Sequence, residues 1–192
     1  MNSTAWKATY TLDIQPAGTQ ASITGMGLYY DGKDRSRIDV TANAMELRAY
    51  YNGAAGTGNG VVCVGNNTNW TCLKTDTAPN DTFKGLSDNI AQYNVAQLPG
   101  RTIAGTAALC YNLTDIKDMA STSWAAECYS SAGPLLYLQA AEISGGVLQV
   151  TTMTATSFST SVSDADFTPP AAPQDMSSYY NQTYNYNDTG TG

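Results

Sequence analysis

Apolar and polar residues alternate along most of this chain, which is the period-two pattern of strands that bury one side of a sheet. The first predicted strand shows the pattern clearly, because one of its sides consists of Trp6, Ala8, Tyr10, Leu12 and Ile14. Further strands are predicted at about Thr19–Tyr30, Arg35–Thr41, Ala44–Tyr51, Val61–Val64, Trp70–Lys74, Arg101–Leu113, Trp124–Ser130, Leu135–Ile143 and Val147–Val162. Hairpin turns and glycine-rich loops separate these strands, as in Asp31-Gly32-Lys33-Asp34. The sequence thus predicts about nine or ten antiparallel strands.

The stretch Asp76–Pro99 breaks the alternation and favours a helix instead. Phe83, Leu86, Ile90 and Tyr93 follow one another at helical spacing, and Asn80 or Asp81 precedes them as a possible cap. We expect a short amphipathic helix here that packs on the sheet. The predicted fold class is therefore mainly β, with some α: a strongly curved antiparallel sheet or half-barrel with one or two short helices.

The chain divides into one domain and a tail. A length of 192 residues suits a single domain of ordinary size. Residues 1–173 form the predicted β-rich domain. Residues 174–192 hold four tyrosines among Ser, Asn, Gln and Gly, a composition typical of a linker or an arm.

The four cysteines suit either two disulfides or one metal site. Cys63 and Cys72 bracket one predicted hairpin, and Cys110 and Cys128 lie in two neighbouring predicted strands. Their spacings match no Cys-x-x-Cys metal pattern, so we favour the disulfides Cys63–Cys72 and Cys110–Cys128. Disulfides place a protein outside the cytosol, or in a hyperthermophile.

Asn-x-Thr triplets occur more often than chance predicts and agree with an extracellular address. N-glycosylation at surface loops is the functional interpretation, and accidental triplets in an Asn- and Thr-rich β protein are the alternative. The triplets begin at Asn2, Asn66, Asn69, Asn80, Asn112, Asn181 and Asn187.

Charge and composition exclude several classes of function. Nine Lys and Arg against sixteen Asp and Glu give a net charge of −7, which excludes a general nucleic-acid-binding protein. The chain has no His, so a Ser-His-Asp triad is impossible, and no Ser-x-x-Lys motif replaces it. We therefore expect no enzyme, no catalytic residue, no resident metal and no cofactor.

No apolar run reaches the ~18 residues of a membrane span, and no signal peptide precedes the first strand. We expect an extracellular or cell-surface protein whose leader or anchor is absent from this chain. Low charge and many neutral polar residues suit an acidophilic archaeal cell surface.

Four segments together resemble a known superfamily. They read GMGLYYDGKDRSRIDV, then VVCVGNNTNWTCLKTD, then GRTIAGTAALCYNL with AECYSSAGPLLYL, and finally SVSDADFTPP. This order, over about Trp6–Pro170, resembles the extracytoplasmic lipoprotein carriers of LolA and LppX type, especially relatives with disulfides. The resemblance implies a half-barrel covered by short helices, with an apolar cavity for acyl chains. Such relatives often carry more helix than this sequence predicts.

The ligand site follows from this resemblance together with the strand pattern. The predicted contacts on the inner side of the curved sheet are Tyr29, Tyr51, Leu109, Tyr137 and Met153. The simpler alternative is that these residues fill the core. Our first hypothesis is a non-catalytic glycosylated domain that binds a lipidic ligand. The alternatives are a filament or coat subunit whose tail contacts a neighbouring copy, and a sugar-binding module with Tyr and Trp faces.

Overall fold

The computed structural model describes residues 4–16, 23–53, 59–66, 68–75, 94–114, 122–144 and 146–175. In this part of the chain one antiparallel sheet of eleven strands accounts for nearly all regular structure. The strands are β1 Trp6–Gln15, β2 Ile23–Tyr30, β3 Arg35–Ala42, β4 Met45–Asn52, β5 Asn59–Asn66, β6 Asn69–Thr75, β7 Asn94–Ile103, β8 Thr106–Thr114, β9 Thr122–Ser130, β10 Leu135–Ser144 and β11 Val147–Ser159. One 3₁₀ turn, η2, covers Asp164–Phe167.

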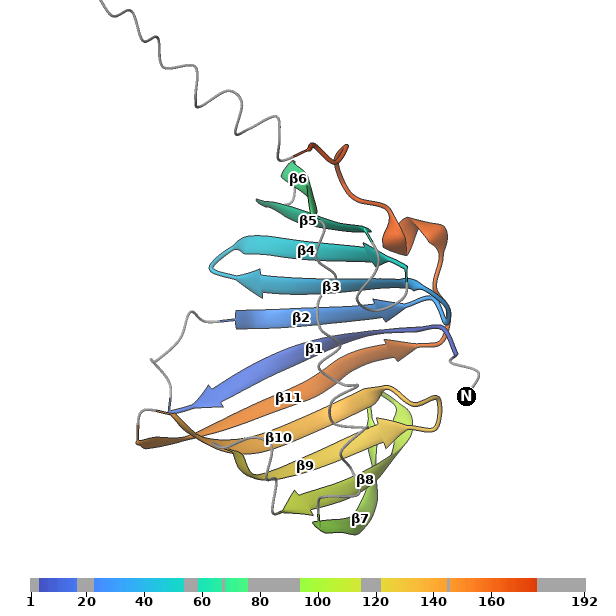
Figure 1. The fold of residues 1–192 in the computed structure, drawn as a ribbon. Coiled ribbons are helices and arrows are strands. Elements are labelled where there is room, and N and C mark those ends of the chain that lie inside the picture. Colours follow the sequence, from blue (N-terminus) through green and yellow to red (C-terminus); the bar gives the residue numbers. More distant parts are fainter. Residues whose placement is uncertain are drawn as a thin grey trace, which may run out of the picture.

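The sheet consists of two meanders joined at the middle. Its strand order is β6-β5-β4-β3-β2-β1-β11-β10-β9-β8-β7, so the first and last strands pair with each other (Figure 1). The consecutive strands β6 and β7 consequently form the two opposite edges. The sheet is open and curled, and the guanidinium of Arg101 on β7 reaches the ring of Tyr137 on β10 across two intervening strands.

The predicted antiparallel fold with two disulfides is confirmed, and three details of the prediction need correction. The predicted single strand Arg101–Leu113 is a hairpin of β7 and β8, because Ala104 and Gly105 take φ angles of 49° and 75° and reverse the chain. Strand β7 begins at Asn94, inside the stretch predicted to be non-strand. The final strand ends at Ser159 rather than Val162. The predicted helical positions Phe83 to Tyr93 lie outside the described residues.

Pairing register divides the strand residues between two faces, because directly opposite residues project to the same side. The Tyr10 face contains Tyr10 and Leu12 of β1 and every residue in register with them, including Met153 of β11. The Lys7 face contains Lys7 and Thr9 and the residues in register with those.

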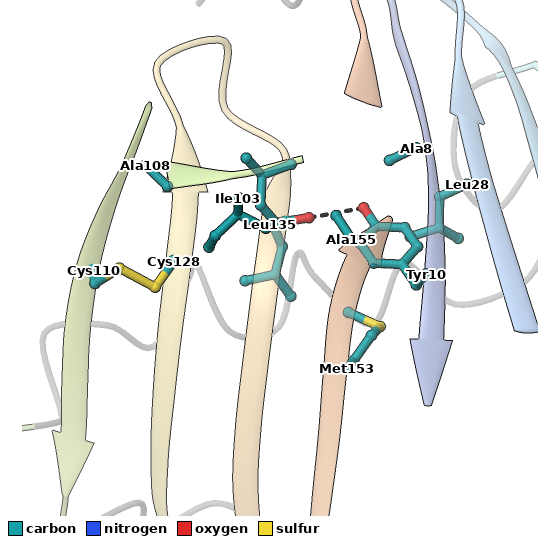
Figure 2. Close-up of a cluster of buried hydrophobic side chains, with 11 residues drawn as sticks. Ala8, Tyr10, Leu28, Ile103, Ala108, Cys110, Cys128, Leu135, Met153 and Ala155 are labelled. Carbon is teal, nitrogen blue, oxygen red and sulfur yellow. Dashed lines mark hydrogen bonds between the residues drawn. A yellow bond between two sulfur atoms is a disulfide. The ribbon is translucent and has the colours of Figure 1, made fainter. Parts of the chain in front are cut away.

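The main core lies near the centre of the sheet. Tyr10, Met153 and Ala155 are buried there, and the Tyr10 hydroxyl donates a 2.8 Å hydrogen bond to the Leu135 carbonyl oxygen (Figure 2). Leu136 is fully buried in the same cluster. Burial removes the Tyr10 ring from water, and the hydrogen bond satisfies its only polar group.

Candidate functional site

The five predicted ligand residues do not all share one face of the sheet. Tyr51, Leu109 and Met153 lie on the Tyr10 face by register. Tyr29 pairs with Lys7, and Tyr137 pairs with Cys128 and Thr154, so both tyrosines lie on the Lys7 face. A single one-sided site can therefore include the first three residues but not the other two.

The two tyrosines on the Lys7 face each stack with an arginine. The Arg37 guanidinium lies 4.4 Å from the centre of the Tyr29 ring, and that of Arg101 lies 5.1 Å from the Tyr137 ring. Burial, followed by the nearby Asp39 carboxylate, raises the pKa of Tyr29. These contacts account for both tyrosines within the fold.

The Tyr10 face is apolar across strands β2 to β5. Leu28 and Ala49 are buried on it, whereas Leu47 and Val64, which pair directly, each remain 39% exposed. Burial raises the pKa of Tyr51, which lies farther along β4 on the same face. The other apolar members in these strands include Ile23, Met26, Ile38, Val40, Ala42, Met45 and Val62.

Charge is distributed unequally between the two faces. Every Lys and Arg in the described strands belongs to the Lys7 face: Lys7, Arg35, Arg37, Arg48, Lys74 and Arg101. On the Tyr10 face the described strand carboxylates are Glu127 and Glu142. Glu127 is buried and accepts a short hydrogen bond from the Tyr129 hydroxyl. Burial raises the pKa of Glu127, because the charged form loses its hydration.

Four of the six basic groups of the Lys7 face form ion pairs within the protein. Arg37 binds the Asp39 carboxylate at 2.5 Å and donates to the Asp166 carbonyl oxygen at 2.9 Å. Arg48 binds Glu46 at 2.7 Å and lies 4.4 Å from the centre of the Trp70 ring. We call these ion pairs and ring contacts of Arg37 and Arg48 the clamp. Its role is structural, since its cations already have anionic and aromatic partners.

The segment after β11, which includes Asp164 and Asp166, forms ion pairs and hydrogen bonds with residues beside this clamp. The Asp166 carboxylate lies 3.1 Å from the Lys7 ammonium, and Asp164 lies 2.9 Å from the Arg35 guanidinium. The same guanidinium lies 4.7 Å from the centre of the Phe167 ring. Burial alone would raise the pKa of Asp166, but the hydrogen bonds from Ser163 and Lys7 lower it.

Gln174, the first residue of the predicted tail, pairs with the edge strand β6. Its N–H donates to the Cys72 carbonyl oxygen, and its carbonyl oxygen accepts from the Lys74 N–H, both at 2.9 Å. The pairing is parallel. Gln174 therefore forms a single parallel bridge at one edge of the sheet.

Both predicted disulfides are confirmed. Cys63–Cys72 joins directly opposite residues of β5 and β6, and Cys110–Cys128 joins opposite residues of β8 and β9. All four cysteines are buried. The alternative of a shared metal site is thereby overturned.

The glycosylation triplets are only partly within the described residues. Asn66 and Asn69 are exposed at the ends of β5 and β6, as the prediction of surface sites requires. Asn112 is half-buried inside β8, not in a loop. The triplets at Asn2, Asn80, Asn181 and Asn187 lie outside the described residues.

Within the described residues no cluster of three His, Cys, Asp or Glu residues could hold a metal ion. That part of the chain also contains no helix long and apolar enough to cross a membrane. A cleft of about 200 Å³ opens beside β1, β2 and β11, lined by polar residues such as Lys7 and Asp166 and by the aromatic residues Tyr29 and Phe158. It is smaller than the ~300–1,000 Å³ usual for a small-molecule site.

Two features escaped the sequence analysis. One is the ion pair between Lys7 and Asp166, which are 159 positions apart. The other is the exposed tip of the β10–β11 hairpin, where Ile143, Val147 and Leu148 surround a turn. The signal for the tip was present in the sequence, since a Gly-Gly pair follows Ile143-Ser144 and precedes Val147-Leu148.

No protein-family model matches the sequence, and no curated protein matches it. Solved structures do match. A structure of MucB gives a TM-score of 0.48 at 13% identity and covers 88% of this chain and 58% of MucB. The MucA/MucB complex of Pseudomonas aeruginosa gives 0.46 at 11% identity, with 88% and 56% covered. A LolA superfamily protein from Nitrosomonas europaea gives 0.39 at 12% identity, with 88% and 92% covered.

The LolA superfamily, which the sequence resembles, is thus among the structural matches. This chain spans little more than half the length of the MucB chains. All three TM-scores lie below 0.5, so the function proposed below rests on the residues of this chain.

Proposed function

We propose that this protein is a non-catalytic extracytoplasmic domain that binds a lipidic or other apolar ligand on the Tyr10 face of its sheet. The observation that carries the proposal is the exposed pair Leu47 and Val64 within an apolar surface that bears no Lys or Arg among the described strands. Tyr51 and Met153 belong to the same face and Leu109 extends it toward β8. The two disulfides support an address outside the cytosol.

Shielding of apolar area is the proposed mechanism. Burying one methylene contributes about 0.8 kcal/mol, so ten methylenes of an acyl chain contribute roughly 8 kcal/mol before the cost of immobilising the ligand. No proton transfer or bond cleavage is needed. Glu127 is the buried carboxyl group of this face, and its ionised form disfavours an anionic ligand group beside it.

The direct test is native mass spectrometry of the protein purified from its own host, before and after mild organic extraction. A lipid-sized mass that extraction removes is the expected result. The same spectra report N-glycans at the exposed Asn66 and Asn69. A protein that carries no such mass and takes up none when mixed with lipid contradicts the proposal.

Glutamate substitutions on the two faces of the sheet test which face binds the ligand. The titrating probe is N-phenyl-1-naphthylamine, an uncharged apolar fluorophore. Leu47→Glu and Leu109→Glu each place a carboxylate on the Tyr10 face and should raise the probe Kd at least about tenfold, or roughly 1.4 kcal/mol. Thr11→Glu adds the same charge at an exposed position on the Lys7 face and should leave the Kd unchanged. Equal effects of all three variants would refute the assignment to the Tyr10 face.

A structural subunit of an extracellular filament or coat is the second candidate, and the pairing of Gln174 with the edge strand β6 favours it. Backbone hydrogen bonds at a sheet edge are a common route to strand addition between chains. Deleting residues 174–192 tests this function by sizing of the purified protein. Loss of assembly with an intact fold supports a subunit, whereas unchanged monomers with retained ligand support the carrier.

A further inference from the structure

The tip of the β10–β11 hairpin is apolar and exposed. Ile143, Val147 and Leu148 are 54%, 48% and 55% exposed. Ser144 and Val147 form the last pair of the hairpin, and Gly146 has a φ of 80°, which suits the tight reversal. Ile143 and Leu148 pair directly and project to one side of the hairpin, whereas Val147 projects to the other, so both sides of the tip are apolar. Such a concentration differs from isolated exposed apolar residues, which are common on any protein.

The tip projects beyond its neighbours in the sheet. On one side β1 pairs with β11 only as far as Val150, and on the other β9 pairs with β10 only as far as Glu142. Figure 1 shows the hairpin reaching outward from the sheet. Ile143, Val147 and Leu148 therefore have no third described strand beside their hairpin, and their side chains are about half exposed.

The two ends of the sheet differ in chemistry. Four of the five exposed large apolar residues of other strands, Met45, Leu47, Val64 and Val95, lie toward the same end as the hairpin tip by register, whereas Leu109 lies toward the opposite end. The ion pairs of Lys7 and Arg35 with Asp31, Asp164 and Asp166 lie at the opposite end. Exposed apolar residues are thus concentrated at the tip end of the strands, where the Arg48–Glu46 ion pair also lies.

We propose that the tip formed by Ile143, Val147 and Leu148 inserts into the surface of an uncharged lipid bilayer. A projecting apolar turn suits a deformable bilayer interface, into which such side chains enter without a preformed groove. The tip carries no basic residue and the exposed Glu142 carboxylate lies beside it, so anionic headgroups are not favoured. Docking at this end brings the exposed part of the Tyr10 face toward the membrane. The inference goes beyond the proposed function, because an empty protein docks as well as a loaded one.

Co-sedimentation with phosphatidylcholine vesicles tests the docking. We expect the wild-type protein to sediment with the vesicles, and the double variant Ile143→Thr with Leu148→Thr to lose roughly tenfold or more of this binding. Threonine keeps β-propensity at these exposed positions, and circular dichroism verifies that the variant is folded.

A reporter pair provides a second readout in otherwise unchanged chains. The variant Leu148→Trp places a tryptophan at the tip. The fluorescence emission of this tryptophan should shift to shorter wavelength when vesicles are added. Thr156→Trp places the same reporter at an exposed position of β11, eight residues away or roughly 26 Å along the strand, and should show no shift.

Several outcomes would overturn the proposal. They are a wild-type protein that ignores phosphatidylcholine, binding only to vesicles that contain phosphatidylglycerol, and a double variant that sediments like the wild type. A wild-type dimer that the double variant converts to monomers would assign the tip to a second copy of the chain instead. None of these outcomes bears on ligand carriage, which native mass spectrometry measures without vesicles.

Discussion

Removing the Cys110–Cys128 disulfide should destabilise this protein more than removing Cys63–Cys72. The two bonds close loops with sequence separations of 18 and 9 residues, and both join buried, directly opposite strand positions. The chain-entropy relation gives roughly 3 kcal/mol for the longer loop and roughly 2.5 kcal/mol for the shorter one, because the longer loop restricts more of the unfolded ensemble. We therefore expect Cys110→Ala with Cys128→Ala to lower the free energy of unfolding by about 3 kcal/mol.

Urea unfolding followed by tryptophan fluorescence measures both losses, with wild type and the two paired alanine variants compared at one pH. Hydrogen exchange adds a local readout. The Lys74 amide of the edge strand β6 donates to the Gln174 carbonyl oxygen, and loss of Cys63–Cys72 should speed its exchange. Free thiols in the denatured, unreduced wild type would refute the reasoning, as would alanine variants that unfold within about 0.5 kcal/mol of wild type.

Three further substitutions test the core, the buried carboxyl and one glycine. Tyr10→Phe removes a buried hydrogen bond to β10 and should lower the free energy of unfolding by about 1 kcal/mol in thermal unfolding; unchanged stability would show that the bond contributes nothing. Glu127 has a pKa raised above its ordinary value, so its stabilising contribution is fully present below the unfolded pKa near 4.5 and is lost as pH rises through the folded pKa. Glu127→Gln should therefore gain stability relative to wild type as pH rises above the unfolded pKa of Glu127, and a gap that stays constant in urea titrations contradicts this. Gly65→Ala drives a methyl group into the Asn69 carbonyl oxygen and to 2.7 Å from the Trp70 ring, and should cost about 1–3 kcal/mol. Gly25→Ala meets only ordinary contacts, the nearest at 3.8 Å, and should be tolerated.

The local alternation of apolar and polar residues accounts for much of what the sequence could predict. The alternation in Trp6–Ile14 marks β1, because a half-buried strand needs no other signal. Cys63 and Cys72 bracket a short hairpin, so their pairing follows from local geometry. The hairpin at Ala104-Gly105 was missed because an Ala-Gly pair between apolar residues is a weak turn signal.

The tertiary structure alone decided which side of each strand meets which partner. Tyr29 and Tyr137 lie in continuous runs of apolar and aromatic residues, where alternation does not mark one side of the strand. Only the register therefore showed that both fall on the opposite face from Met153. The pairing of β1 with β11 and the contact of Lys7 with Asp166 join the two ends of the chain. Such long-range contacts leave no periodic trace in the sequence, because each partner's local environment looks like that of any other polar strand residue.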